Sequence, residues 1–337
     1  FTANDGTAPY TFSYHINAGP AIHLASPTNT ITVSVPTGTP GTFTYHLDSV
    51  KNTGSNLCKT IYANSFVDVT VNANTGLALT SGSSTQAVCQ NIAIANVVYT
   101  ISGGGNDATA TGLPLGVTGV YSAGTFTISG TPTTPGTYNY SVTATGLCLP
   151  NSLSGTITVN PDAAIALTTA NNMQEVCINS PITSISYSIS GGGTGATVSG
   201  LPAGVTGVLS GGVFTISGTP TVANTFNYTV TTSGTCHQTT ATGTILVNPL
   251  PARNFTTNTP TCETRDIQFT DASVPNAGVL NNWQWNFGDP ASGAANTSAL
   301  QNPTHNYVLP GTYNVSLTVT TDKGCVSTGP SIPVTIE

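Results

Sequence analysis

The sequence predicts an all-β protein made of tandem β-sandwich modules. Runs in which apolar and polar residues alternate recur along its 337 residues, for example at residues 31–35, 138–142 and 313–319. A period of two is typical of strands that bury one face. Gly-Gly-Gly, Thr-Pro-Gly-Thr and Ser-Gly-Thr-Pro segments separate the runs and have the composition of turns. No window of helical length keeps an apolar stripe at 3.6-residue spacing, and many short strands with regular turns indicate sandwiches.

An internal duplication defines the modules. Residues 89–161 align without a gap with residues 177–249, at a constant offset of 88 positions (177 − 89), and more than half of the aligned residues are identical. Self-similarity at a fixed period is the signature of an array of similar units. Borders are expected after the Val-Asn pairs that close the repeats, because proline follows two of them and stops a strand. We therefore predict four modules: residues 1–73, 74–160, 161–248 and 249–337.

The linkers between these modules are only a few residues long. The sequence therefore predicts sandwiches arranged in a linear rod, without independently moving units. The first module starts within a strand-like pattern, so we expect its N-terminal strand to be missing. On this interpretation the chain is an internal piece of a longer polypeptide.

The composition excludes two classes of partner. Charged residues make up 5% of the chain, against about 25% in ordinary globular proteins. The net charge of −7 comes from 12 acidic and 5 basic residues, and the basic ones are scattered. A nucleic-acid surface needs a basic patch, and a membrane helix needs about 18 consecutive apolar residues. We expect neither nucleic-acid binding nor membrane insertion.

The seven cysteines follow the repeat. The two cysteines of each duplicated module are 59 positions apart (148 − 89 and 236 − 177), and those of the last module are 63 apart (325 − 262). No Cys-x-x-Cys or His-x-x-x-His cluster is present to favour a metal–thiolate site. The spacing predicts three disulfides, each inside one module: Cys89 with Cys148, Cys177 with Cys236, and Cys262 with Cys325.

Cys58 is left over by this pairing. Its partner is expected before Phe1, and a free or intermolecular thiol is the alternative. A disulfide framework implies an oxidising, extracellular compartment.

Two blocks of sequence resemble a known family. Residues 112–143 and 200–231 carry Gly-Leu-Pro-x-Gly-Val, then Phe-Thr-Ile-Ser-Gly-Thr-Pro-Thr, then Thr-Tyr/Phe-Asn-Tyr-x-Val-Thr. They are similar to bacterial Ig-like repeats, which occur in tandem in large surface proteins. Residues 1–73 are similar to repeats of gliding-motility and other surface proteins of Bacteroidetes. These resemblances imply Ig-like sandwiches, a bacterial cell-surface location and export by type IX secretion.

The last module resembles a PKD (polycystic-kidney-disease) domain. The resemblance lies in Ile267-Gln-Phe-Thr-Asp, Trp283-Gln-Trp-Asn-Phe-Gly-Asp, Asn302-Pro-Thr-His-Asn-Tyr and Gly311-Thr-Tyr-Asn-Val. Pro290 departs from the family, which usually has glycine there, and implies an altered loop up to Leu300. The resemblance implies structural roles for the motif residues Trp283, Trp285, Phe287, Gly288, Asp289, His305 and Tyr307.

Few side chains suit chemistry. Asp289 is the best candidate for a catalytic carboxylate, but it has no paired acid, and no nucleophile elbow, metalloprotease helix or phosphate-binding glycine loop occurs. No acidic loop of the calcium-binding type is present, so weak calcium binding at Asp266, Asp271 or Asp289 is the only cofactor left open. Trp283 and Trp285 also leave a sugar-stacking platform open.

One modification site is also predicted. Asp48-Ser49-Val50 fits the pattern used for O-glycosylation in Bacteroidetes, which makes Ser49 a candidate acceptor.

Together these features predict a non-enzymatic structural or adhesive segment of a large secreted bacterial surface protein, such as a stalk or a filament subunit, that serves attachment, motility or cell–cell contact. The expected partners are neighbouring modules of the same longer chain, identical chains in a filament, and surface glycans. The alternative is a set of spacer or glycan-binding modules from a large secreted hydrolase.

Overall fold

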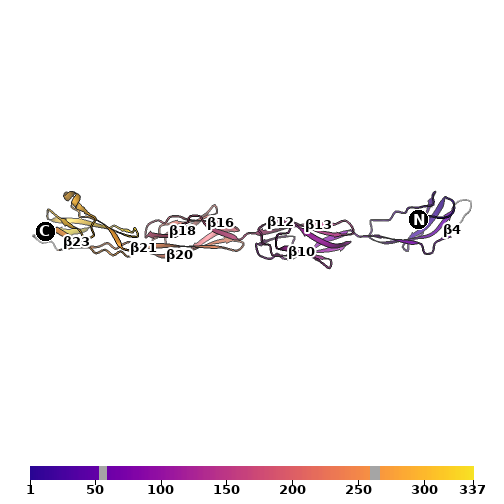
Figure 1. The fold of residues 1–337 in the computed structure, drawn as a ribbon, viewed down its shortest axis with the longest axis horizontal. Coiled ribbons are helices and arrows are strands. Elements are labelled where there is room, and N and C mark those ends of the chain that lie inside the picture. Colours follow the sequence, from indigo (N-terminus) through magenta and orange to yellow (C-terminus); the bar gives the residue numbers. More distant parts are fainter. Residues whose placement is uncertain (53–58, 259–265) are drawn as a thin grey trace. The chain divides into compact units, whose positions relative to one another are not determined.

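The computed structural model describes residues 1–52, 59–258 and 266–337, and nearly all of their regular structure is β-strand (Figure 1). The predicted all-β fold is therefore confirmed. The chain divides into two compact units, Phe1–Asn160 and Pro161–Glu337. Within the described residues no helix is long and apolar enough to span a membrane.

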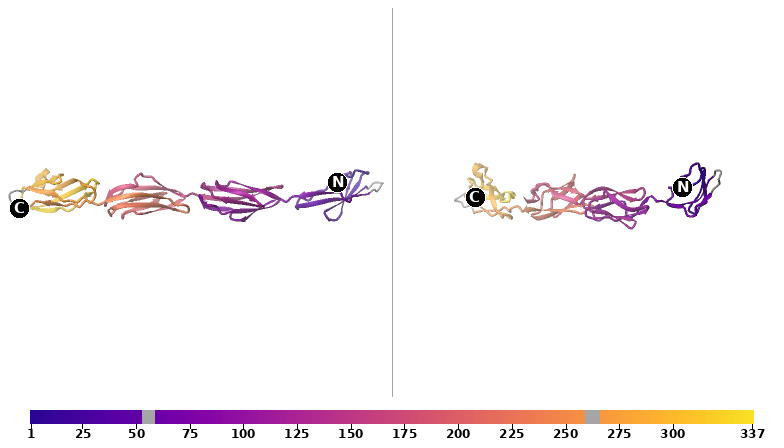
Figure 2. Two further views of the ribbon diagram at one scale, coloured as in Figure 1. Left: turned by 60° about the horizontal axis from the view of Figure 1, so that its bottom comes forward. Right: turned by 45° about the vertical axis from the view of Figure 1, so that its right-hand side comes forward.

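The second module is a sandwich of two four-stranded sheets (Figure 2). The sheets have the strand orders β10-β11-β8-β6 and β7-β13-β12-β9. All neighbours are antiparallel except β7, which runs parallel to β13 along the sheet edge. The strands are β6 (Thr75–Ser81), β7 (Thr85–Cys89), β8 (Val97–Gly103), β9 (Gly105–Thr111), β10 (Val117–Ser122), β11 (Thr125–Gly130), β12 (Gly136–Gly146) and β13 (Asn151–Asn160).

The glycine run predicted to be a turn carries the chain from one sheet to the other. Strand β8 ends at Gly103, and β9 starts at Gly105 in the opposite sheet. Gly103 has a φ of 63°, and a Cβ there would lie 2.2 Å from the carbonyl oxygen of Asn74. Only glycine tolerates this close approach.

The third module repeats this architecture at the offset of the sequence duplication. Its sheets have the orders β14-β16-β19-β18 and β15-β21-β20-β17, and β15 runs parallel to β21. The strands are β14 (Ala163–Leu167), β15 (Met173–Cys177), β16 (Ile185–Gly191), β17 (Gly193–Ser199), β18 (Val205–Ser210), β19 (Val213–Gly218), β20 (Asn224–Gly234) and β21 (Thr240–Asn248).

A pair of buried tyrosines connects the two sheets in each of these modules. The hydroxyl oxygens of Tyr99 and Tyr140 lie 3.1 Å apart, and those of Tyr187 and Tyr228 lie 2.9 Å apart. Each hydroxyl thus satisfies the other inside the core. Burial, followed by the hydrogen bond from the partner tyrosine, raises the pKa of Tyr140 and of Tyr228 far above the usual tyrosine range.

The first module forms only one sheet among its described residues. The strand order is β2-β1-β3-β4, and β5 also pairs with β3. Residues 31–35 alternate between half-buried and exposed, as in a strand, but belong to no strand. The strands are β1 (Tyr10–Ile16), β2 (Ile22–Ser26), β3 (Gly41–Asn52), β4 (Lys59–Ile61) and β5 (Phe66–Val71).

The fourth module packs a three-stranded sheet, β22-β23-β26, against the sheet β25-β24-β27-β28, in which β29 also pairs with β27. The departure predicted after Asp289 is a 3-10 helix, η1 (Pro290–Asn296), which leaves the two sheets intact. The strands are β22 (Phe255–Thr257), β23 (Asp266–Asp271), β24 (Leu280–Asn286), β25 (Thr297–Ser298), β26 (Thr304–Asn306), β27 (Gly311–Thr321), β28 (Val326–Ser327) and β29 (Ile332–Ile336).

Candidate functional site

The two cysteines of the third module lie at opposite ends of its sandwich. Cys177 ends β15 and is paired with Asn248, the last residue of β21, at the C-terminal end of the module. Cys236 follows β20 at the N-terminal end, where its neighbour His237 accepts a hydrogen bond from Ala163. Strand β20 has 11 residues, so about 30 Å separates the two ends. A disulfide needs Cα atoms within about 7 Å, which excludes the predicted bond between Cys177 and Cys236.

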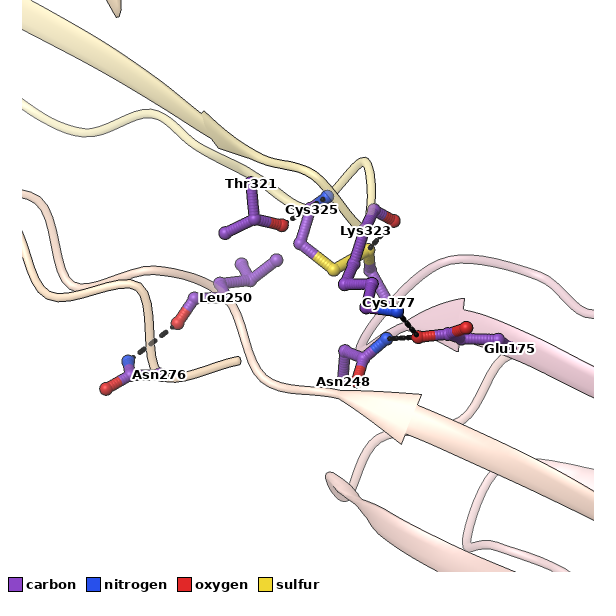
Figure 3. Close-up of a disulfide and its surroundings, with 8 residues drawn as sticks. All are labelled: Glu175, Cys177, Asn248, Leu250, Asn276, Thr321, Lys323 and Cys325. Atoms are coloured by element: carbon purple, nitrogen blue, oxygen red, sulfur yellow. Dashed lines mark hydrogen bonds and ion pairs between the residues drawn. A yellow bond between two sulfur atoms is a disulfide. The ribbon is translucent and has the colours of Figure 1, made fainter. Parts of the chain in front are cut away.

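Cys177 instead bonds Cys325 of the fourth module (Figure 3). Their Cα atoms are 5.4 Å apart. Cys325 is fully buried just after β27, where its amide donates to the hydroxyl of Thr321. The predicted disulfides within modules are therefore wrong for these cysteines. Cys177, the first cysteine of the third module, thus lies at the border with the fourth module and bonds that module's second cysteine.

Polar contacts surround this junction disulfide (Figure 3). Lys323 Nζ lies 3.3 Å from Glu175 Oε1, which also accepts a 2.9 Å hydrogen bond from Asn248. The hydrogen bond from Asn248, followed by that from Lys323, holds the pKa of Glu175 below its usual range. Both charged side chains are about 40% exposed, so their ion pair adds little stability beside the disulfide.

The remaining cysteines divide into three groups. Cys89 and Cys236 are disulfide-bonded. Cys148 is a free, half-buried thiol, which contradicts its predicted disulfide with Cys89. Its Sγ lies 3.6 Å from the carbonyl oxygen of Asn72, at the end of the first module. Cys58 and Cys262 lie outside the described residues.

The PKD motif residues form the core of the fourth module. Trp285 is buried, and its indole nitrogen donates to the carbonyl of Leu300 at 2.9 Å. The ring of His305 stacks on Phe287, with centroids 4.4 Å apart, and meets the edge of Tyr307 at 4.5 Å. The hydroxyl of Tyr307 donates to the carbonyl of Phe287, while Gly288 forms the following turn with a φ of 70°. These contacts are those of a packed core.

The carboxylates of this module bond to protein groups. Asp289 Oδ2 lies 3.2 Å from Nε2 of His305, and the His305 side chain is 2% exposed, so a substrate cannot reach this pair. Asp271 accepts from the indole of Trp283 at 2.8 Å, and Asp266 accepts from Asn306 at 2.6 Å. No cluster of three metal-ligating side chains occurs in the part of the chain that the structure describes.

Ser49 lies inside the first module. It is 7% exposed and sits on β3, between β1 and β4. The folded strand therefore does not present its hydroxyl as a glycan acceptor. Ser49 lies two and four residues after the buried Leu47 and Tyr45, on the same face of β3. This alternation in the sequence indicated burial, and the three-residue glycosylation motif does not take it into account.

The ion pair beside the junction disulfide was not predicted from the sequence. Glu175 and Lys323 are 148 positions apart (323 − 175), and Ala87 replaces Glu175 in the second module. A repeat alignment alone therefore gives no signal for this ion pair.

Comparisons with known proteins bear on the fold and on the last module. Residues 248–336 match the family model of the PKD domain. No curated protein matches the chain significantly. A three-domain fragment of titin, in an E-to-A mutated variant, is similar over 76% of this chain and 98% of its own length, with a TM-score of 0.50 and 12% identity.

Two bacterial structures are similar over a smaller part of the chain. The PKD1 domain of Vibrio anguillarum Epp is 30% identical and covers 27% of this chain and 96% of its own, with a TM-score of 0.23. The PKD1 domain of the Vibrio cholerae metalloprotease PrtV is 27% identical and covers 26% and 98%, with a TM-score of 0.22. The titin fragment shows that the fold is that of tandem Ig-like domains, and the family match identifies the last module as PKD-like.

Proposed function

We propose that the chain is a non-catalytic structural segment of an extracellular bacterial surface protein, a stalk or filament subunit that serves attachment, motility or cell–cell contact. The observation that carries this proposal is the disulfide between Cys177 and Cys325, which joins two consecutive modules. Modules that act independently of one another do not need a covalent bond between them. Such a bond persists in oxidising compartments, which supports an extracellular location.

The junction restrains the linker between the third and fourth modules. Residues 249–254 connect β21 to β22 and include Pro249 and Pro251. A linker this short limits independent movement of the two modules, but it remains a single connection about which they can rotate. The disulfide adds a second covalent connection, and Asn276 adds a 2.8 Å hydrogen bond to the carbonyl of Leu250 in the linker. Two connections prevent rotation about one linker, as a stiff stalk requires.

A distance measurement tests the stiffness. Spin labels on non-natural amino acids at the exposed positions Val208 and Leu300 report the distance between the two modules. We expect one narrow distribution in the intact chain and a markedly broader one in the Cys177→Ser, Cys325→Ser double variant. An equally narrow distribution in that variant contradicts a stiffening role. Val208 paired with Val222, within the third module, is the matched control.

Electron microscopy with antibodies against residues 1–337 tests the location. Labelled stalks or filaments on the bacterial surface support the proposal. If the antibodies label only a secreted enzyme and not the cell surface, the alternative of spacer or glycan-binding modules in a hydrolase is favoured. Glycan binding that is lost in Trp283→Ala, with the fold intact, favours the glycan-binding form of that alternative.

A further inference from the structure

The segment of residues 290–300 forms a wall along the sheet β25-β24-β27-β28 of the fourth module. It contains η1 and β25 and is the loop that the sequence predicted to be altered. Before β25, the backbone amides of Phe287 and Asp289 donate to the backbone and side-chain oxygens of Asn296, at 2.9 and 2.7 Å. After β25, the indole of Trp285 donates to the carbonyl of Leu300 at 2.9 Å. Hydrogen bonds on both sides of β25 therefore hold the wall in place.

A groove lies between this wall and the outer face of β24 and β27. Its volume is about 520 Å³, which is within the range of about 300–1,000 Å³ for small-molecule sites. Strand pairing places Gln284 opposite Thr318 and Asn286 opposite Ser316, and these four side chains form the floor. Thr297 of the wall pairs with Asn286 at the edge of the floor. The floor side chains are spaced by about 5 Å across the strands and about 7 Å along them.

The polar groups of the floor are available to a ligand. Gln284, Ser316 and Thr318 make no side-chain hydrogen bond in the part of the chain that the structure describes. The side-chain oxygen of Asn286 accepts two hydrogen bonds, at 2.9 Å from a backbone amide and at 3.3 Å from the side chain of Asn296. These bonds fix the Asn286 amide group and leave its nitrogen to donate.

The lining selects an uncharged ligand rich in hydroxyl groups. None of the described residues that line the groove is charged, and Asp271 and Asp289 of this module bond Trp283 and His305 instead. The net charge of −7 on the chain repels anions. Hydroxyl and amide side chains both donate and accept hydrogen bonds, as sugar hydroxyls do. Ala299 and the threonine methyl groups add apolar contacts for the C–H groups of a sugar ring.

We propose that this groove binds an uncharged oligosaccharide. The floor side chains hydrogen-bond the hydroxyls of one sugar ring, and Thr297 contacts the ring from the wall. The site differs from the tryptophan platform that the sequence left open, because the indole of Trp283 donates to Asp271 on the opposite sheet. The inference deepens the proposed function and rests on it for its biological role, since it names the chemistry by which the segment attaches.

A glycan array probed with the intact 1–337 chain tests the ligand class. It carries linear hexasaccharides of glucose, mannose and N-acetylglucosamine, branched mannose glycans, and hexasaccharides of galacturonic acid as the anionic control. We expect binding to at least one neutral glycan, with a Kd of about 1 mM or lower by titration calorimetry, because neutral hydrogen bonds contribute modestly. We expect no binding to the galacturonic acid chains.

The outcomes of the array distinguish the source of the ligand. Binding to linear chains indicates a polysaccharide, and binding to branched mannose glycans indicates a glycoprotein. Both support the proposal. It is overturned if no neutral glycan binds at about 10 mM, tenfold above the expected Kd, or if the galacturonic acid chains bind equally well.

Variants that keep the strands intact locate the site. Thr318→Val preserves the shape of the side chain and removes its hydroxyl, so we expect about fivefold weaker binding. Gln284→Ala removes a donor and an acceptor and should weaken binding at least tenfold. Asn282→Ala and Thr320→Val change a pair on the same two strands, outside the groove, and should leave the affinity unchanged. Equal affinities in all four variants contradict a site in the groove.

Trp283→Leu separates the groove from the tryptophan platform. It removes the aromatic face and keeps an apolar side chain, so binding in the groove should stay within about twofold of the unchanged chain. Binding that is lost in this variant and retained in Gln284→Ala, with both folds intact by circular dichroism, overturns the proposal. The spin-label distances and the surface labelling test the structural function separately, so a failure here leaves those results unaffected.

Discussion

The first and second modules have corresponding strands, β3 with β12 and β5 with β13, but very different cores. In the second module Ile128, Val142 and Ile157 are fully buried between two sheets. In the first module the corresponding Val33 and Val69 are only half-buried on an open face. The comparison shows that alternation in the sequence marks the inward-facing residues, while a paired strand and full burial also depend on the second sheet. The missing second sheet also explains why the first module has a valine at a position where the second module has a glycine.

That substitution is Val35 in place of Gly130. Gly130 has a φ of 132°, and a Cβ there would lie 2.3 Å from the carbonyl oxygen of Gly116, just before β10. We expect Gly130→Val to destabilise the second module by about 3 kcal/mol or more through strain and overpacking. Val35→Gly, where no such strand is paired, is expected to cost about 1 kcal/mol or less. Hydrogen exchange resolved by module measures the loss of stability in each variant. A loss of about 1 kcal/mol or less in Gly130→Val would contradict the strain assigned to this position.

Core truncation should give the next largest difference. Ile157→Ala removes a fully buried side chain and should cost about 3 kcal/mol. Val69→Ala on the open face should cost about 1 kcal/mol, since the side chain is already partly hydrated. Equal losses of hydrogen-exchange protection in the two modules contradict the view that the face is open.

Alkaline pH should destabilise the second and third modules through their buried tyrosine pairs. Folding raises the pKa of Tyr140 and Tyr228 above the value of about 10 expected in the unfolded chain, so the neutral form stabilises the fold. This contribution is complete below pH about 10 and is lost as the pH rises above it. We expect protection of the second and third modules to fall there. In Tyr228→Phe the fall should weaken in the third module and persist in the second, which serves as the control.

Removal of one hydroxyl should give the smallest and most diagnostic difference. Tyr140→Phe leaves Tyr99 without this partner and should cost about 1 kcal/mol. Tyr45→Phe removes a buried hydroxyl that has no partner and should be neutral or slightly stabilising. Thermal unfolding followed by module-resolved exchange distinguishes the two. A clear destabilisation by Tyr45→Phe indicates a partner for that hydroxyl within the chain.

Local patterns predicted the strands but not the connections between modules. Alternation in residues 138–142 and 313–319 predicted β12 and β27, and the Gly-Gly-Gly run predicted the turn between β8 and β9. The cysteine partners were wrong because a spacing of 59 residues does not say at which end of a sandwich each cysteine lies. The parallel pairing of β7 with β13 was also missed, since its two strands are far apart in sequence.

The core of the fourth module was predicted more fully, because its motif carries the packing residues themselves. Trp285, His305 and Tyr307 lie together as the resemblance implied. The contact of Glu175 with Lys323 was not predictable, because it depends on how two modules meet.

The junction disulfide also determines where tension runs when the second unit is pulled from its ends. Cys177 and Cys325 are 148 positions apart and enclose most of the third and fourth modules. A force applied at residues 161 and 337 passes through the sulfur–sulfur bond and bypasses residues 178–324, which stay slack and folded. Reduction would place those residues under tension, and their unfolding would then release up to about 500 Å of extended chain. The bond thus keeps residues 178–324 free of tension in an oxidising medium and exposes them to it in a reducing one.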